Sequence, residues 1–177
     1  MGQVLAWYLA VLVVYLPALW RAGAADPKMG LGMPREGSAR VTLAGTGLSL
    51  PLGFWLAVAT PNPWSTPLDE FLQLLTVVPE HFLIFGILAT WLLPDRRLAW
   101  TRGSDRHGPG AAYALIATGI VFGLAHLGKP NLAEVVTSFP LGFVFAWMTL
   151  HSGSIWPAVA AHVALNLVPM AVLPAAA

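Results

Sequence analysis

Six long apolar segments alternate with shorter polar connections along the chain. They run from about Val4 to Trp20, Val41 to Thr60, Phe71 to Leu93, Ala111 to Leu127, Leu132 to Leu150 and Ile155 to Leu173. Each is long enough to cross a hydrocarbon layer of about 30 Å as a helix. Open sheets cannot satisfy their backbone groups in lipid, and no alternating pattern of about ten residues indicates a barrel. The pattern predicts an all-α, polytopic transmembrane helical bundle of about six spans.

Composition supports a membrane protein and limits its chemistry. Hydrophobic residues make up 57% of the 177 positions and charged residues only 10%, far from the range of soluble globular proteins. We expect a single integral membrane domain over residues 1–177. The chain has no cysteine, which excludes disulfides, thiolate metal sites and a cysteine nucleophile. A net charge of +1 gives no indication of a nucleic-acid partner.

The basic residues predict an orientation. Eight of the nine Lys and Arg residues lie in two polar loops, at about 21–40 and 94–110. With six spans these loops lie on the same side, and the positive-inside rule makes that side cytoplasmic. Both termini would face outward, and a bacterial cytoplasmic (inner) membrane is the expected location. The segment "AGAAD" resembles a signal-peptide cleavage site, but no basic residue precedes the first apolar run and Arg21 follows it directly, which favours a retained span.

Few ionisable or strongly polar side chains lie inside the predicted spans, so they are the natural candidates for function. They are Glu80, His81, His126, Glu134, His162 and Asn166. An isolated buried charge costs several kcal/mol unless it is paired, so we expect these groups to meet in the interior of the bundle. Glu134 lies near a water interface with Lys129, where snorkelling or a loose ion pair is expected of both.

Helical spacing indicates which of these residues share a face. His162 and Asn166 are four residues apart, as are Phe122 and His126, so each pair lies on one side of its helix. Glu80 and His81 are adjacent and point about 100° apart, so at most one aims straight at a shared centre, and we expect Glu80 to do so. His126 falls near the end of its predicted span. Either that helix continues past Leu127 or the site is displaced toward the outer face.

Three stretches of the sequence resemble the motifs of a known family. The stretches "PEHFLIFG", "FGLAHL" and "SGSIWPAVAAHVALNL" are similar, in order, to the motifs of the CPBP (CAAX protease and bacteriocin-processing) family of glutamic intramembrane proteases. The family pattern is Glu-Glu-x-x-x-Arg, then Phe-x-x-x-His, then His-x-x-x-Asn or Asp. The residues that match are Glu80, Phe122, His126, His162 and Asn166. The motif-bearing core of the domain spans about residues 70–174.

The first motif departs from the family pattern at two positions. His81 stands where a second glutamate is usual, and Phe85 stands where an arginine is usual. The resemblance implies that the residues at these two positions support the site. His81 is therefore assigned a supporting role, as is Phe122. A compact subgroup that trims C-terminal sorting tails, the myxosortase-like proteins, would accommodate such a variant.

The resemblance implies a catalytic mechanism. Amide hydrolysis without Ser, Cys or metal needs a water activated by a general base and donors for the developing oxyanion. By this resemblance Glu80 is the base, His126 positions the water or shares its proton, and His162 with Asn166 stabilises the oxyanion. The implied substrate is a membrane-anchored or lipid-proximal peptide segment in the bilayer, such as a C-terminal tail, a leader or a CAAX-like segment. No cofactor and no metal are expected, and nothing in the sequence specifies an oligomeric state.

Other interpretations of the same residues stay open. His126 alone can be a structural histidine, and His162 with Asn166 can supply ordinary interhelical hydrogen bonds. Glu80 and the histidines include ligand types for zinc, although no His-Glu-x-x-His helix is present. A non-catalytic immunity factor, membrane chaperone or transporter is a further possibility, although no pair of broken helices supports transport.

Overall fold

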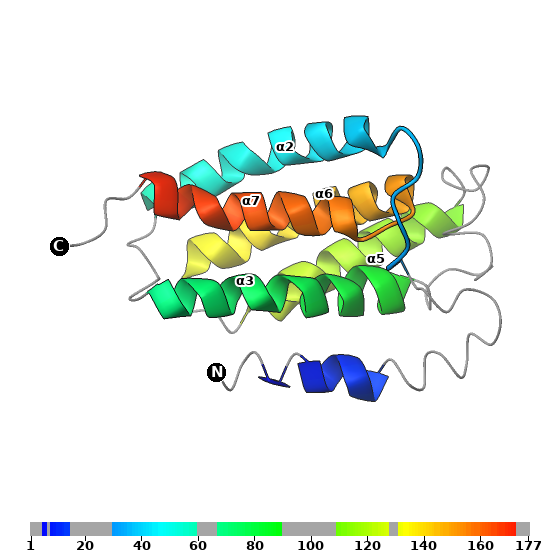
Figure 1. Ribbon diagram of the computed structural model, residues 1–177, viewed down its shortest axis with the longest axis horizontal. Coiled ribbons are helices and arrows are strands. Elements are labelled where there is room, and N and C mark those ends of the chain that lie inside the picture. Colours follow the sequence, from blue (N-terminus) through cyan, green and yellow to red (C-terminus); the bar gives the residue numbers. More distant parts are fainter. Residues whose placement is uncertain are drawn as a thin grey trace.

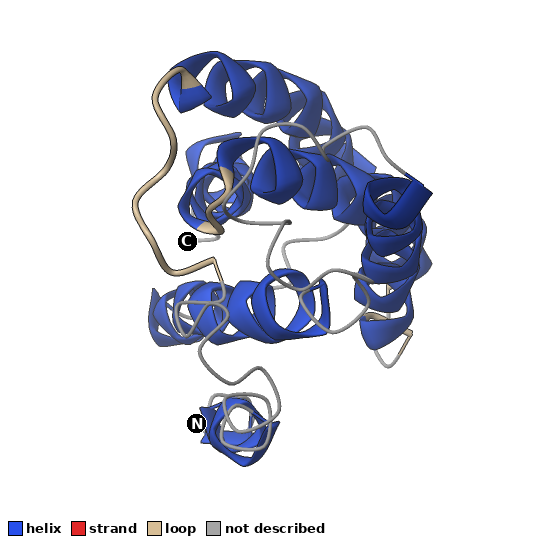
Figure 2. Ribbon diagram, turned by 90° about the vertical axis from the view of Figure 1, so that its right-hand side faces the viewer, coloured by secondary structure: helices blue, strands red, loops and turns tan. Residues whose placement is uncertain are grey.

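The computed structural model describes residues 5–6, 8–14, 30–59, 67–89, 109–127 and 131–172, and all of the regular structure within these ranges is helical. The elements are α2 (Ser38–Ala59), α3 (Pro67–His81), the π-helix η1 (Phe82–Leu88), α5 (Pro109–Ala125), α6 (Leu132–Ser152) and α7 (Trp156–Val172). A shorter helical stretch covers residues 8–14. Figure 1 shows these helices packed side by side with their axes roughly along one direction, and Figure 2 shows them from one end of the bundle. The predicted all-α class is confirmed.

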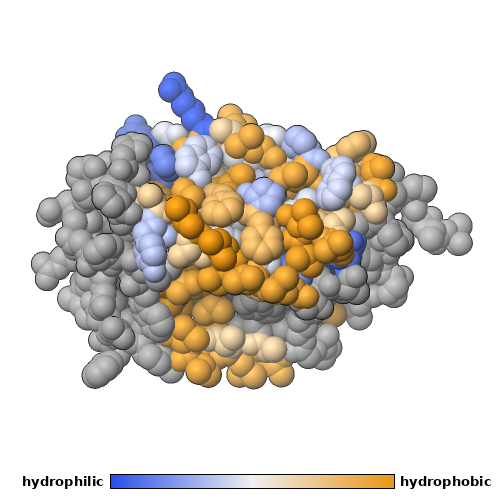
Figure 3. All heavy atoms as spheres, turned by 180° about the vertical axis from the view of Figure 1, so that it is seen from behind, coloured by the Kyte–Doolittle hydropathy of each residue, from blue (hydrophilic) through white to orange (hydrophobic). Residues whose placement is uncertain are grey.

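Three helices are long and apolar enough to cross a membrane: Ser38–Ala59, Phe71–Leu88 and Leu132–Ser152. The helices α5 and α7, with 17 residues each, are shorter apolar helices. Large apolar side chains lie on the outside, Leu43 and Leu132 each being 74% exposed, and apolar residues cover much of the described surface in Figure 3. This surface suits contact with lipid, and the chain is an integral membrane protein. The count of about six spans stays a prediction, because the second half of the first segment lies outside the described residues.

Helix boundaries differ from the apolar runs by a few residues, mostly at proline and glycine. Pro67 and Pro109 are the first residues of α3 and α5, a position where the missing amide of proline is not needed. The polar first turn of α3 precedes the apolar run, which explains why the helix begins before Phe71. Helix α2 begins at Ser38, inside the predicted loop 21–40, directly after Gly37 with a φ of 82°.

The two ends of the bundle carry different features. Helices α2 and α5 begin at the same end, on the right of Figure 1, where α6 ends and α7 begins. We call this the basic end, since each of these two helices directly follows one of the basic segments. Residues 30–35 close it, because the amides of Ile155 and Arg35 donate to the carbonyls of Gly30 and Ser152 at 2.9 and 3.0 Å. Helix α5 ends and α6 begins at the opposite end.

Glycines allow α5 and α6 to pack closely. A Cβ atom added to Gly142 would lie 2.6 Å from the carbonyl oxygen of Gly119, so only hydrogen fits there. On α5, Gly119 and Gly123 in turn face the rings of Phe143 and Phe139. Small residues at helix interfaces permit such approach in membrane proteins, where packing drives association. The last turns of α5 are thereby held against the first half of α6.

Pro79 interrupts the hydrogen bonding of α3 just before the π-helix. It has no amide hydrogen, so the carbonyl of Leu75 lacks its usual helical donor. The hydroxyl of Tyr8 donates to that carbonyl at 3.4 Å, which joins the N-terminal helical stretch to α3. The backbone then continues as the π-helix from Phe82. Short π-helical turns are rare in proteins, and those that occur often lie at functional sites.

Candidate active site

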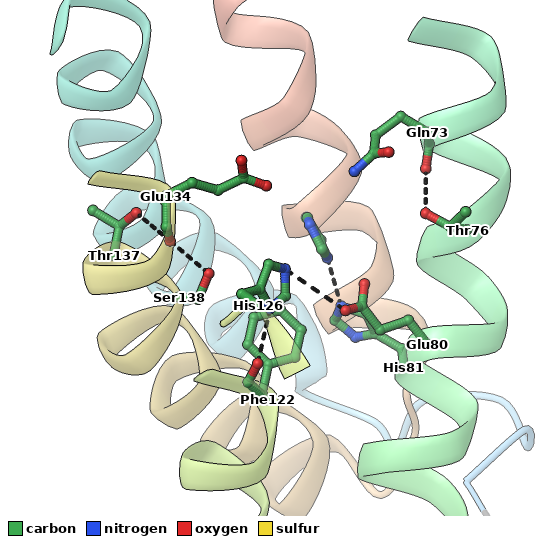
Figure 4. Close-up of polar contacts among 10 residues, drawn as sticks. Gln73, Thr76, Glu80, His81, Phe122, His126, Glu134, Thr137 and Ser138 are labelled. Carbon is green, nitrogen blue, oxygen red and sulfur yellow. Dashed lines mark hydrogen bonds and ion pairs between the residues drawn. The ribbon is translucent and has the colours of Figure 1, made fainter. Parts of the chain in front are cut away.

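Glu80 and His126 approach each other inside the bundle. The Oε1 atom of Glu80, near the end of α3, lies 3.7 Å from Nε2 of His126, which directly follows α5. The two residues are buried, with 6% and 9% of their surfaces exposed, and Figure 4 shows their polar ends facing each other. The separation exceeds that of a hydrogen bond, and in such a case a water molecule can link the two groups.

The end of α5 holds His126 in place. Its backbone amide donates to the carbonyl of Gly123 at 3.1 Å, three residues back, in place of the carbonyl of Phe122. The carbonyl of Phe122 lies 2.8 Å from Nδ1 of the His126 ring and can only accept. Nδ1 therefore carries a proton, and in the neutral ring Nε2 presents a lone pair toward Glu80. The helix ends at Ala125, so the possibility that it continues past Leu127 was wrong.

A second pair of side chains lies beside the first. Nε2 of His81 is 2.8 Å from Nδ1 of His162, which joins the end of α3 to α7. His81 is completely buried, and its Nδ1 has no hydrogen-bond partner within the described part of the chain. Glu80 and His81 thus both contact histidines, but on different helices.

Aromatic rings enclose the three histidines. The ring of Phe122 lies 4.8 Å from that of His126, 5.8 Å from that of His162 and 6.0 Å from that of His81, measured between centroids. Phe145 of α6 stacks on His162, at 5.1 Å and an interplanar angle of 21°. The histidines therefore lie in an apolar environment, in which electrostatic interactions and hydrogen bonds are stronger than in water.

Asn166 lies on α7 one helical turn beyond His162, a rise of about 6 Å along the axis. Its side chain is half-buried. The spacing puts its amide on the same face of α7 as the His162 ring. Side-chain contacts bring Glu80, His126 and His162 into one cluster. The place of Asn166 beside them rests on this helical register.

Two further polar side chains point toward the site. In Figure 4 the carboxylate of Glu134, in the first turn of α6, and the amide of Gln73, on α3, extend toward the space beside Glu80 and His126. Both residues are half-buried. Sequence reasoning assigned Glu134 to a water interface and did not consider Gln73, although Gln73 is two helical turns before Glu80 and therefore on a similar face. Lys129 lies outside the described residues.

Sequence reasoning also missed Phe145, and it treated Phe85 only as a departure from a motif. Their rings lie 4.9 and 5.0 Å from that of His81. A phenylalanine in an apolar helix carries no signal that it contacts a histidine. Among the described residues, no group of three or more His, Asp or Glu is arranged to hold a metal ion.

The structure is a helical membrane bundle that buries a Glu–His pair where α3, the end of α5 and α7 come together. These features are those of a membrane-embedded enzyme. Residues 62–168, more than half of the chain, match the family described as type II CAAX prenyl endopeptidase Rce1-like. The chain belongs to this family and is a membrane-embedded peptidase, which confirms the family resemblance. No curated protein and no solved structure gives a match. Placement in the myxosortase-like subgroup stays a prediction.

Proposed function

We propose that the chain is a glutamic-type intramembrane endopeptidase that hydrolyses a peptide bond in a membrane-anchored protein. The observation that carries this proposal is the pair of Glu80 and His126, buried and 3.7 Å apart, in a family of membrane peptidases. A carboxylate and an imidazole in this relation are the groups needed to activate water without a metal or a side-chain nucleophile.

The attacking water binds between the two residues. Nδ1 of His126 is committed to the carbonyl of Phe122, so its Nε2 accepts one hydrogen of the water, while Glu80 accepts the other. A water held by two acceptors presents an oxygen lone pair outward, toward a substrate carbonyl. His126 then orients the water, and Glu80 is the general base.

Hydrolysis follows in two steps. Glu80 takes a proton from the water while the water oxygen bonds to the carbonyl carbon of the substrate. The carbonyl oxygen becomes an oxyanion. The C–N bond then breaks, and Glu80 returns the proton to the departing amine. The products are a new carboxyl terminus and a new amino terminus, and the carboxylate regains its starting state.

His162 and Asn166 supply hydrogen-bond donors to the oxyanion. They are one turn apart on α7, so the imidazole and the amide can reach the same oxygen from one side. Preorganised donors in a water-poor site are among the largest contributions to catalysis of acyl transfer. The rings of Phe122 and Phe145 fix the plane of the His162 imidazole.

The position of the site suggests which substrates reach it. His126 follows the end of α5, away from the basic end of the bundle. If the basic segments face the cytoplasm, as the positive-inside rule predicts, the site opens toward the outer half of the bilayer. The substrate is then a membrane-anchored segment, such as a leader or a C-terminal tail, cleaved on the non-cytoplasmic side.

The test is a comparison of protein termini in native-host membranes that contain the wild type, Glu80→Gln or Glu36→Gln. Glu36 is an exposed carboxylate beside α2, so the same chemical change there is a matched control. We expect processed termini present with wild type and Glu36→Gln to disappear with Glu80→Gln at equal protein levels. Unchanged processing in Glu80→Gln would overturn the proposal.

A further inference from the structure

We propose that His81 is a positioning residue that fixes the proton of His162 on Nε2 and so makes this imidazole an oxyanion donor. The inference rests on the proposed function for its catalytic meaning. Its structural basis is separate: it is the hydrogen bond of 2.8 Å between Nε2 of His81 and Nδ1 of His162. By the resemblance described above, His81 stands at the position of a glutamate in the first motif.

One proton occupies the space between the two rings. At 2.8 Å, two N–H groups facing each other would clash, and two lone pairs would repel. In a neutral pair, either His81 donates from Nε2 or His162 donates from Nδ1. Each choice fixes whether the second nitrogen of each ring carries a proton.

The buried nitrogen of His81 decides between these choices. If His162 donated, His81 would carry its proton on Nδ1, which is fully buried without an acceptor among the described residues. If His81 donates, its Nδ1 is a bare acceptor in the same place. Buried N–H groups without partners are rarer than under-satisfied acceptors in native proteins. The environment of His81 therefore favours its Nε2–H tautomer.

The tautomer of His81 determines the tautomer of His162. Its Nδ1 accepts from His81, so its own proton is on Nε2, on the far side of the ring from His81. The stacked ring of Phe145 holds this orientation. His162 can then donate to an oxyanion without becoming charged.

The same geometry accounts for Phe85. A carboxylate at position 81 can only accept, so it would draw the proton of His162 to Nδ1 or stabilise an imidazolium, and it would bring a charge into the core. The pair of histidines needs no counter-ion, and the apolar ring of Phe85 packs 5.0 Å from that of His81. The two departures from the motif thus fit each other, because an uncharged donor and an uncharged neighbour replace an acid and a base.

The direct test is ¹⁵N NMR of the histidine side chains in the wild-type protein in bilayers, since nitrogen shifts distinguish protonated from bare ring nitrogens. Variants in which one histidine at a time is replaced by glutamine assign each nitrogen signal to its residue. We expect a protonated Nε2 and a bare Nδ1 for His162. A proton on Nδ1 of His162 would overturn the inference, whatever the activity of the protein.

Two variants of His81 add a functional readout. His81→Leu fits the apolar surroundings but cannot donate, whereas His81→Gln keeps an N–H donor. In His81→Leu we expect His162 to populate both tautomers. Processing in native membranes should slow on the order of 10-fold or more, a smaller decrease in rate than the loss of a whole oxyanion donor would cause. His81→Gln should recover most of the rate.

The control is His151→Leu, at a half-buried histidine in the last turn of α6 that should leave both readouts unchanged. An unaltered His162 spectrum with wild-type processing in His81→Leu would reject the positioning role. If Glu80→Gln still processed normally while His162 carried its proton on Nε2, the catalytic proposal would fail and the tautomer assignment would stand.

Discussion

Glu80 and His81 are neighbours in the sequence, yet each faces a different histidine: Oε1 of Glu80 lies 3.7 Å from Nε2 of His126, and Nε2 of His81 lies 2.8 Å from Nδ1 of His162. Two consecutive residues at the end of α3 therefore connect α5 and α7. Directly after them the backbone becomes π-helical, at Phe82. Any change at this point of α3 is expected to alter both the proposed water-binding side and the proposed oxyanion side of the site.

Asn166→Ala removes a proposed oxyanion donor while leaving the water-binding pair in place. The expected result is a fall in processing rate on the order of 10²- to 10³-fold, as for loss of one such donor in other acyl-transfer enzymes. Processing in native membranes is the measurement. Leu167→Ala, at the adjacent exposed position of α7, is the matched truncation and should process normally. Equal rates for the two variants would remove Asn166 from the mechanism.

Strong zinc chelators should leave processing unchanged, because in the proposed mechanism Glu80 activates the water without a metal. The measurement is the rate in purified membranes before and after chelation, with a zinc-dependent membrane protease treated in parallel as the positive control. Loss of activity that added zinc restores would favour the metalloprotease interpretation of Glu80 and the histidines.

Gly142→Ala should destabilise the bundle, since the new Cβ would lie 2.6 Å from the carbonyl oxygen of Gly119. Overpacking of this kind costs about 1–3 kcal/mol. Gly47→Ala, where no atom lies within 4 Å of the added Cβ, is the control. Unfolding of both variants in mixed micelles measures the difference. Comparable stability would mean that α5 and α6 can separate without cost.

Single cysteines test the predicted orientation, because the chain has none of its own. Lys129→Cys follows the end of α5, and Met33→Cys lies in the exposed segment at the basic end, where Met33 is 87% exposed. A membrane-impermeant maleimide should label Lys129→Cys in intact spheroplasts and Met33→Cys only after lysis. The reverse result would place the site opening on the cytoplasmic side.

Much of the fold could be predicted from the sequence, because an apolar run long enough to cross lipid has few alternatives to a helix. The boundaries were less certain where a polar turn such as that at Pro67 precedes the run. The π-helix could not be predicted, since "FLIFGIL" is equally apolar in an α-helix. The difference lies in backbone hydrogen bonding after Pro79, which hydropathy does not record.

The candidate site was predictable in part. Motif resemblance brought together Glu80, His126 and His162, which the structure gathers from three helices. It did not predict that His81 bonds to His162, because a rotation of about 100° between adjacent helical residues was expected to turn His81 away. The role of Asn166 stays a prediction, founded on its spacing from His162.

The ring of Phe122 contacts the rings of all three histidines in the cluster. Replacing any one of them changes the packing surface that the other two share. Substitutions at His81, His126 and His162 are therefore thermodynamically coupled, and their separate effects on rate or stability should not sum. Separating the contributions of these residues to catalysis requires double-mutant cycles in which Phe122 is one of the two substituted residues.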